Sequence, residues 1–426
     1  MKYALINGII LDGTKDMEPI CGKTVLTENE KIKDIVKDGT DLTGYKIIDL
    51  KGKYLLPGLI NLHVHLAGNG KPQKKQRDST KLVNLMFSNP ITSYVAYNMV
   101  KNYAQIELNS GVTTIRTVGG LKDLDSRVRD EIRDGKYLGP RILAANEGIS
   151  VPGGHMAGSV AIVAHSIEEA KRHIDHLQEQ GADLVKLMVT GGVLDAKEKG
   201  TPGQMKMDPA MIKAICDYAH AKGYKTSAHV ESSEGVKEAL KNGVDSIEHG
   251  AEPDEETIRL FKERGSFLIT TLSPALPYAL FDRSVSNASE VEQYNGNVVF
   301  EGIIHCCKKA LENGIPVGLG NDVGCPWVSQ YDFWRELYYF TKYIGVDNRF
   351  ALYTATLNNA RLVGIDDMTG SIEKGKDADL IVTDRNPLED LTTLRTVRMV
   401  MARGKLLADP VVKRNAIVDQ ELDKYL

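Results

Sequence analysis

The stretch LPGLINLHVHLAGNG, residues 56–70, places His63 and His65 at the end of an apolar run. A run of this kind, bounded by Pro-Gly and Gly-Asn-Gly, is typical of a buried strand followed by a loop. Side chains two residues apart on a strand point to the same side, so both imidazoles are expected to project together from its carboxyl end. Paired imidazoles form a natural edge of a metal site, and hydrogen-bonded core histidines are the alternative interpretation of this pair alone.

Seven further apolar runs follow the same pattern, and helix-like stretches that end in glycine lie between several of them. The eight expected strands cover residues 59–66, 112–118, 141–149, 184–192, 225–231, 246–250, 267–272 and 316–322. The expected helices include residues 166–181, 208–223, 233–243 and 255–265. This alternation predicts an α/β fold, a (β/α)8 TIM barrel over residues 54–368. A doubly wound open sheet is the alternative, but no GxGxxG motif opens a helix after the first strand.

The two ends of the chain, residues 1–53 and 369–426, have a different character from the middle. Both contain short runs of β-forming residues separated by turns, and Asn-Gly and Asp-Gly pairs in the first end are hairpin signals. Two β-rich ends on either side of a long barrel predict that they pair with each other. We therefore expect a small β-sandwich domain formed by both ends together.

The composition excludes several classes of partner. The net charge of -4 over 426 residues argues against nucleic acid or a membrane surface as the partner. No apolar run reaches the roughly 18 residues that a membrane helix needs. The five cysteines are odd in number and show no CxxC spacing, which is typical of a reduced cytoplasmic enzyme without disulfides.

Metal-binding residue types recur at the ends of other expected strands. His229, His249 and Asp322 each lie at the last positions of a strand, where barrel enzymes collect their catalytic groups. Lys186 lies within the apolar run DLVKLMVT, where an unpaired ammonium group would be costly. It is either a lysine paired with a carboxylate at the wet end of the strand, or a lysine of lowered pKa that reacts with carbon dioxide. The resulting carbamate could bridge two divalent cations and leave room for a shared hydroxide.

These motifs, in this order, resemble the amidohydrolase superfamily, in its subtype with two metals and a carboxylated lysine. The resemblance rests on PGLINLHVHL, the strand-four lysine, SAHVE, SIEHGAE, GNDVG and the tail ATLNNARLVGIDDMTGSIEKGKDADLIVTD. It implies metal-activated hydrolysis, with Asp322 also moving the proton of the bridging hydroxide to the leaving group. The ligands that it implies are His63, His65 and Asp322 for the more buried metal, His229 and His249 for the more exposed one, and Lys186 as the bridge.

Within the superfamily the chain is similar to prolidase-like dipeptidases that hydrolyse Xaa-Pro or Xaa-Arg/Lys bonds, and more distantly to imidazolonepropionase. The segments VPGGHMAG and KLMVTGGV carry this likeness, which implies that His155 donates to the scissile carbonyl oxygen. Those dipeptidases often have a tyrosine two residues after the strand-five histidine, where this chain has Glu231. The substrate-binding residues that we expect are His155, Glu231, Tyr278 and Trp327.

The function predicted from all these features is metal-dependent hydrolysis of an amide or peptide bond in a small molecule, with a dipeptide as the first choice. An N-acyl amino acid or a cyclic amide is the alternative substrate. A one-metal deaminase and a non-enzymatic scaffold rank lower, because Lys186 is present and no ligand is missing. Two Zn²⁺ ions and a carbamate on Lys186 are the expected cofactors, and a cytoplasmic homo-oligomer is the expected state.

Overall fold

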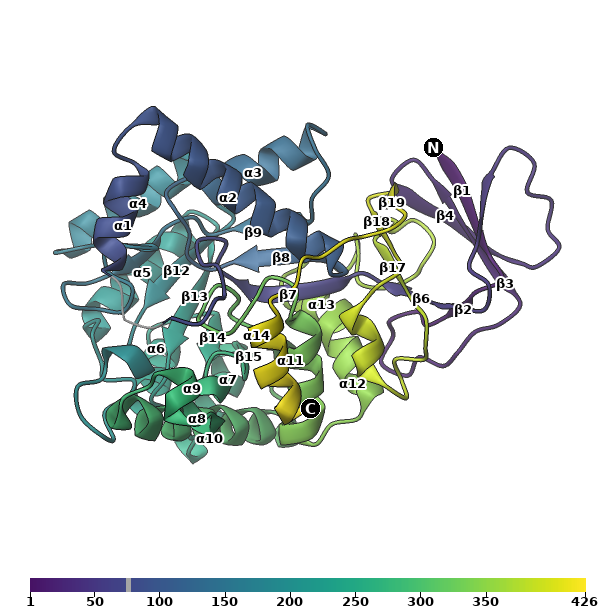
Figure 1. Ribbon diagram of the computed structural model, residues 1–426. Helices are drawn as coiled ribbons and strands as arrows, with labels where there is room; N and C mark the ends of the chain where they lie inside the picture. Colours follow the sequence, from purple (N-terminus) through teal and green to yellow (C-terminus); the bar gives the residue numbers. More distant parts are fainter. Residues whose placement is uncertain (74–77) are drawn as a thin grey trace.

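The computed structural model describes residues 1–73 and 78–426, and its larger part is a barrel of parallel strands (Figure 1). The strands of the barrel are β7 (Leu59–Val64), β8 (Val112–Thr117), β9 (Arg141–Ala144) continued by β10 (Gly148–Ser150), β12 (Leu184–Met188), β13 (Lys225–Val230), β14 (Ser246–His249), β15 (Phe267–Thr270) and β16 (Val317–Leu319). Short β11 (Ala161–Val163) adds to the edge of β10. The predicted (β/α)8 barrel is confirmed, with the third predicted strand divided in two.

Closure of the barrel brings the first and last strands together. Beyond β16, the backbone N–H of Asp322 donates to the carbonyl of His63 at 3.0 Å, and that of His65 donates to the carbonyl of Val323 at 3.0 Å. These bonds join two sheets, one of order β7-β8-β9 and one of order β11-β10-β12-β13-β14-β15-β16. The sequence-distant ends of β7 and β16 are therefore neighbours, which places both histidines of the opening stretch beside Asp322.

Helices follow the strands and pack against one another in chain order. The four expected helices are present as α4 (Ile167–Glu179), α5 (Pro209–Ala221), α6 (Ser233–Lys241) and α7 (Glu255–Arg264). Helix α7 begins where the Asp254 carboxylate accepts from Thr257 N–H and ends at Gly265, whose φ of +65° suits glycine. The remaining helices of the barrel region are α1 (Ser79–Met86), α2 (Pro90–Asn109), α3 (Leu124–Arg133), η1 (Val193–Asp195), α8 (Leu276–Leu280), α9 (Arg283–Ser286), α10 (Glu290–Glu312), α11 (Phe333–Tyr339), η2 (Phe340–Ile344), α12 (Asn348–Tyr353), η3 (Thr354–Asn358) and α13 (Asn359–Leu362).

Two sheets from both ends of the chain form the smaller unit beside the barrel (Figure 1). The first has the order β4-β3-β1-β5 and the second the order β19-β18-β17-β6-β2. Val25 and Leu5 of the first sheet and Leu55 and Leu380 of the second belong to one buried apolar cluster. The strands of these sheets are β1 (Lys2–Ile6), β2 (Ile9–Ile10), β3 (Lys23–Glu28), β4 (Lys31–Lys37), β5 (Lys46–Asp49), β6 (Tyr54–Pro57), β17 (Leu380–Thr383), β18 (Met399–Ala402) and β19 (Lys405–Leu407).

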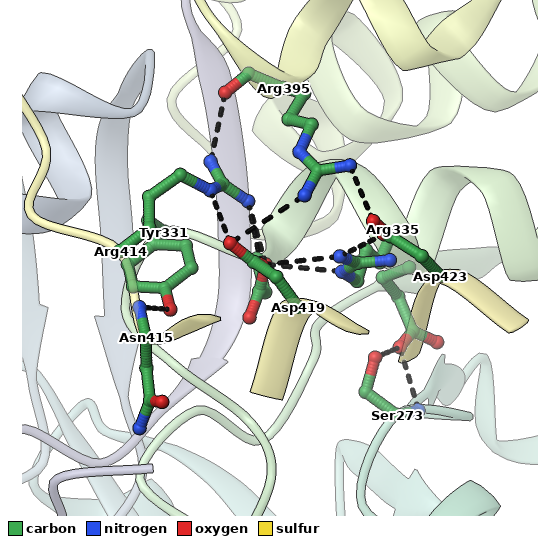
Figure 2. A network of polar contacts seen from close by, with 10 residues as sticks. Ser273, Tyr331, Arg335, Arg395, Arg414, Asn415, Asp419 and Asp423 are labelled. Atoms are coloured by element: carbon green, nitrogen blue, oxygen red, sulfur yellow. Dashed lines mark hydrogen bonds and ion pairs between the residues drawn. The ribbon is translucent and has the colours of Figure 1, made fainter. Parts of the chain in front are cut away.

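Two segments differ from the expected division of the chain. Strand β6 pairs antiparallel with β17, so residues 54–57 lie in the smaller unit's sheet rather than in the barrel. After η4 (Leu391–Arg395) and β19, the chain returns to the barrel as α14 (Ala416–Leu422) and η5 (Asp423–Tyr425). Buried Val418 and Leu422 of α14 join the barrel's apolar core, and Asp419 and Asp423 bind Arg335 of α11 (Figure 2).

Within residues 1–73 and 78–426, none of the helices combines the length and the apolar character that crossing a membrane requires.

Candidate metal centre

The ends of five barrel strands bring the six residues expected as ligands to one place. His63 lies on β7, Lys186 on β12, His229 on β13 and His249 at the end of β14, while His65 directly follows β7 and Asp322 lies three residues beyond β16. The ring centroids of His63 and His249 lie 4.8 Å apart, and those of His229 and His249 lie 4.7 Å apart. The carboxyl ends of the parallel strands thus form one polar cluster in an otherwise apolar interior.

The backbone of His249 explains how two adjacent residues of β14 both reach this cluster. Glu248 Oε2 lies 2.8 Å from His63 Nδ1, and the His249 ring also packs against His63. Strict strand alternation would send these neighbours to opposite sides. His249 has a φ of +70°, outside the strand range, and Asp322 has a φ of +53°. The chain leaves regular strand geometry at both residues, and such outliers often mark functional sites.

Three histidines of the cluster have their Nδ1 atoms engaged in hydrogen bonds. The partners are Glu248 for His63, the Gly119 carbonyl for His65 at 2.8 Å, and Thr271 Oγ1 for His249 at 2.7 Å. Because a carbonyl oxygen only accepts hydrogen bonds, His65 donates to it through Nδ1–H. In a neutral ring the other nitrogen, Nε2, then carries a lone pair and no proton. Burial lowers the pKa of His63 to about 4, which keeps the His63 ring neutral at pH 7.

The free Nε2 atoms face a carboxylate. Asp322 Oδ1 lies 3.4 Å from His63 Nε2 and 3.3 Å from His65 Nε2, without hydrogen-bond geometry. Burial opposes ionisation of Asp322, and its pKa lies well below the usual range only with positive charge beside it at His63 and His65. Lone pairs that face an ionised carboxylate repel each other unless a cation lies between them. Hydrogen bonds on the second ring nitrogen are also the usual support of metal-binding histidines.

Buried groups below the cluster hold His63 in place, and the sequence interpretation missed them. Glu248 accepts from Arg116 Nη2 at 2.7 Å, from Ser227 Oγ at 2.6 Å and from Ser246 Oγ at 2.7 Å. Burial disfavours the Glu248 anion, but Arg116 and His63 more than compensate, and its pKa lies well below normal. The signal for both residues was present as charged letters inside the apolar runs VTTIRTV and SIEHG.

Lys186 is buried in the middle of β12, with 1% of its surface exposed. Among the residues that the structure describes, its Nζ has no hydrogen-bond partner. Desolvation lowers its pKa to about 8, although Glu248 pulls the other way. The pairing with a carboxylate at a wet strand end, one of the two interpretations of this lysine, is not found in the described structure. Near pH 8 a part of the Lys186 side chains therefore carries a neutral amine, and the neutral amine is the form that can react with carbon dioxide.

His155 and Glu231 flank His229 on the open side of the cluster. The rings of His155 and His229 stack with centroids 3.9 Å apart, and His155 Nδ1 lies 2.6 Å from Asp195 Oδ2. Glu231 Oε1 lies 3.9 Å from His229 Nε2. Burial raises the pKa of Glu231 to about 8, and the anions Asp322 and Asp195 add to the shift. Asp195, the partner of His155, is a further residue that the sequence interpretation did not identify.

The two aromatic residues expected at the substrate site, Tyr278 and Trp327, are packed against other parts of the protein. Trp327 is 3% exposed and its ring packs edge-on against Phe281 with centroids 5.0 Å apart. Tyr278 is partly buried, and burial together with nearby Cys325 raises its pKa. Tyr278 lies in α8, beyond β15, and Trp327 lies beyond β16. Their contact with a substrate remains a prediction.

Two overlapping groups of side chains have the composition of cation sites. His63, His249 and Asp322 form one group, and His229, Glu231 and His249 form the other, with all ligand atoms of a group within 4.8 Å of one another. Imidazole and carboxylate donors suit Zn²⁺ and related divalent ions. The donor set therefore fits two cations. It differs from the expected grouping by placing His249 with His63 and Asp322, and by adding Glu231.

Comparisons with known proteins support the interpretation of this chain as a hydrolase. The sequence profile of the Amidohydrolase family matches residues 54–407. A solved structure from Bifidobacterium longum, described as a proposed prolidase, is 34% identical with a TM-score of 0.87, over 99% of this chain and 98% of that one. A solved Xaa-Pro dipeptidase with bound methionine is 28% identical with a TM-score of 0.82, over 96% of this chain and all of that one. Ochratoxinase of Aspergillus niger is 25% identical over 95% of this chain and 86% of its own length.

Proposed function

This chain belongs to the amidohydrolase family, whose members hydrolyse carbon–nitrogen bonds, and from that premise we propose that it is a dipeptidase that uses two divalent cations. The proposed substrate is a dipeptide of the Xaa-Pro or Xaa-Arg/Lys type. The likeness to a solved Xaa-Pro dipeptidase over nearly the whole chain supports this choice. The proposed ions are Zn²⁺, and the proposed setting, a cytoplasmic homo-oligomer, remains a prediction.

The observation that carries the proposal is the pair of imidazole nitrogens that face the Asp322 carboxylate. His63 and His65 would hold the more buried ion together with Asp322, and His229 and His249 the more exposed one. Lys186 would bridge after its neutral amine attacks carbon dioxide, which forms an N–C bond and releases one proton. The bound ions would act as Lewis acids and lower the pKa of a water molecule that they hold.

The chain's own residues would then carry the protons. Asp322, with one oxygen lacking a hydrogen-bond partner among the described residues, would take a proton from the attacking water and pass it to the leaving nitrogen. His155, held through Nδ1 by the Asp195 carboxylate at 2.6 Å, would donate from its other ring nitrogen to the carbonyl oxygen of the substrate. When ionised, Glu231 cannot polarise that carbonyl as a tyrosine would, because an anion repels a developing oxyanion.

The test is a hydrolysis screen with the Zn²⁺-loaded protein over Xaa-Pro dipeptides, Xaa-Arg dipeptides, N-acyl amino acids and cyclic amides. We expect turnover of a dipeptide class, loss of turnover with a chelator, and recovery when Zn²⁺ is restored. Asp322→Asn should keep its fold by circular dichroism and lose turnover. Full activity of this variant would refute the proposed mechanism, and activity on non-peptide amides alone would replace the dipeptide with the second candidate. Glu231 in place of the dipeptidase tyrosine is the observation that favours that candidate.

A further inference from the structure

Glu231 lies where a further ligand for the more exposed cation would lie. It follows His229 by two residues at the end of β13, so both side chains project from the same side of the strand. The ligand atoms of His229, Glu231 and His249 all lie within 4.8 Å of one another. Two ligands of one Zn²⁺ ion are at most about 4.2 Å apart, twice a bond of roughly 2.1 Å. Movements of a few tenths of an ångström in each side chain would complete such a site.

The charged groups that act on Glu231 are themselves negative and do not balance the negative charge of its carboxylate. Its Oε2 is buried and has no hydrogen-bond partner in residues 1–73 and 78–426. The nearby ionisable groups that act on it are the carboxylates of Asp322 and Asp195. Within the same described part of the chain, no lysine or arginine lies within 4.0 Å of its carboxylate. A buried carboxylate beside two others is costly unless a cation joins them.

The backbone around Glu231 is built closely and limits where its side chain can go. The Glu231 N–H donates to Thr190 Oγ1 at 3.0 Å. A Cβ atom at Gly203 would lie 2.3 Å from the Glu231 carbonyl carbon, and one at Gly192 would lie 3.4 Å from Glu231 Oε1. Both glycines thus allow a loop to pass directly over this residue. The carboxylate lies beside His229, and the Glu231 side chain is 12% exposed.

We propose that Glu231 binds the more exposed cation directly, as a further protein ligand beside His229, His249 and the bridging Lys186. The inference rests on the proposed two-cation site and adds a ligand to it. A carboxylate strengthens binding at that position and shifts its preference toward harder ions such as Mn²⁺. It also removes Glu231 from the substrate's reach as a free anion, so a cationic substrate group would gain little from it.

The experiment compares Glu231→Gln with Asp195→Asn, a matched control that removes one negative charge from the same region. Metal-free protein is titrated with Zn²⁺ against a competing chelator, and bound zinc is counted by mass spectrometry. We expect two tight sites in the wild type and in Asp195→Asn. In Glu231→Gln we expect one tight site and a second weakened by about tenfold or more. The visible spectrum of the Co²⁺-loaded protein should change in Glu231→Gln and not in the control.

Equal zinc affinity of Glu231→Gln and the wild type would overturn the inference, and so would an equal loss in both variants, which would reveal a general effect of charge. Two retained zinc ions with weaker binding of Xaa-Arg but not Xaa-Pro dipeptides would assign Glu231 to the substrate instead. Failure of the proposed function is distinguishable from these outcomes, because it would show as a wild type that binds no zinc or binds it and hydrolyses no amide.

Discussion

Replacing Arg335 with methionine tests how much the ion network between the barrel and the tail contributes to stability. The side chain is 1% exposed, and its guanidinium contacts Asp332 at 3.2 Å, Asp419 at 3.3 Å and Asp423 at 2.6 Å (Figure 2 shows the last two). Methionine has a similar length and keeps most apolar contacts of the stem. The change therefore removes mainly the charge and its hydrogen bonds.

The magnitude follows from which acids lose their cation. Asp419 still has Arg414 at 2.8 Å, and Asp423 still has Arg395 at 2.9 Å. Asp332 is buried and keeps only Arg414, at 3.5 Å. Breaking a buried pair by removing one partner typically costs about 3–5 kcal/mol, because the other charge stays buried. Since two of the three acids remain paired, we expect the lower end, about 3 kcal/mol.

Urea unfolding followed by circular dichroism measures the effect, because Trp334 lies next to Arg335 and would confound fluorescence. The control is Lys213→Met, which removes an exposed pair with Asp217 at 2.9 Å and should cost about 0–1 kcal/mol. The free energy of unfolding should fall clearly further for Arg335→Met than for the control. Equal losses in the two variants would refute the reasoning that burial makes this network matter.

Two further predictions concern the site's support and a buried acid. In Gly320→Ala the new Cβ would lie 2.4 Å from His63 Cβ and 2.5 Å from the His63 backbone nitrogen. We therefore expect His63 to be displaced and bound zinc to be lost. Metal analysis that finds a full complement of zinc in this variant would contradict the expectation. Burial raises the pKa of Glu107 in α2 well above 4.5, so folding takes up a proton and the free energy of unfolding falls as pH rises from about 4.5 toward that pKa. Glu107→Gln cannot ionise, so its stability relative to the wild type should grow over this range in urea titrations, and a constant difference would show that the carboxyl does not titrate there.

Several features could be predicted from the letters alone, because they depend on local patterns. Buried parallel strands need continuous apolar runs, so the strands of the barrel stood out by their composition and spacing. Barrel enzymes collect their catalytic groups at the carboxyl ends of the strands, so His63, His229, His249 and Asp322 were visible as candidates. The apolar neighbours of Lys186 made a buried lysine one of two interpretations, and the structure shows this side chain with 1% of its surface exposed.

Other features depended on how the elements pack and were beyond any local pattern. Whether α14 stays with the β-rich end or returns to the barrel is decided by Arg335, which lies about eighty residues earlier in the chain. His249 reaches the cluster only because its φ of +70° breaks the alternation on which the sequence argument depends. Glu248 and Arg116 come from different strands, and their contact is set by the register of the closed barrel.

The sequence by itself thus determined that a barrel exists and which residues collect at its carboxyl end. The tertiary structure decided which nitrogen of each histidine is free, which acids remain without a partner, and that Glu231 joins the group. The physical reason is the separation along the chain of the groups that interact. Strand and helix patterns arise from neighbours along the chain, whereas the protonation and orientation of a buried side chain depend on atoms that closure of the barrel brings within about 3–4 Å.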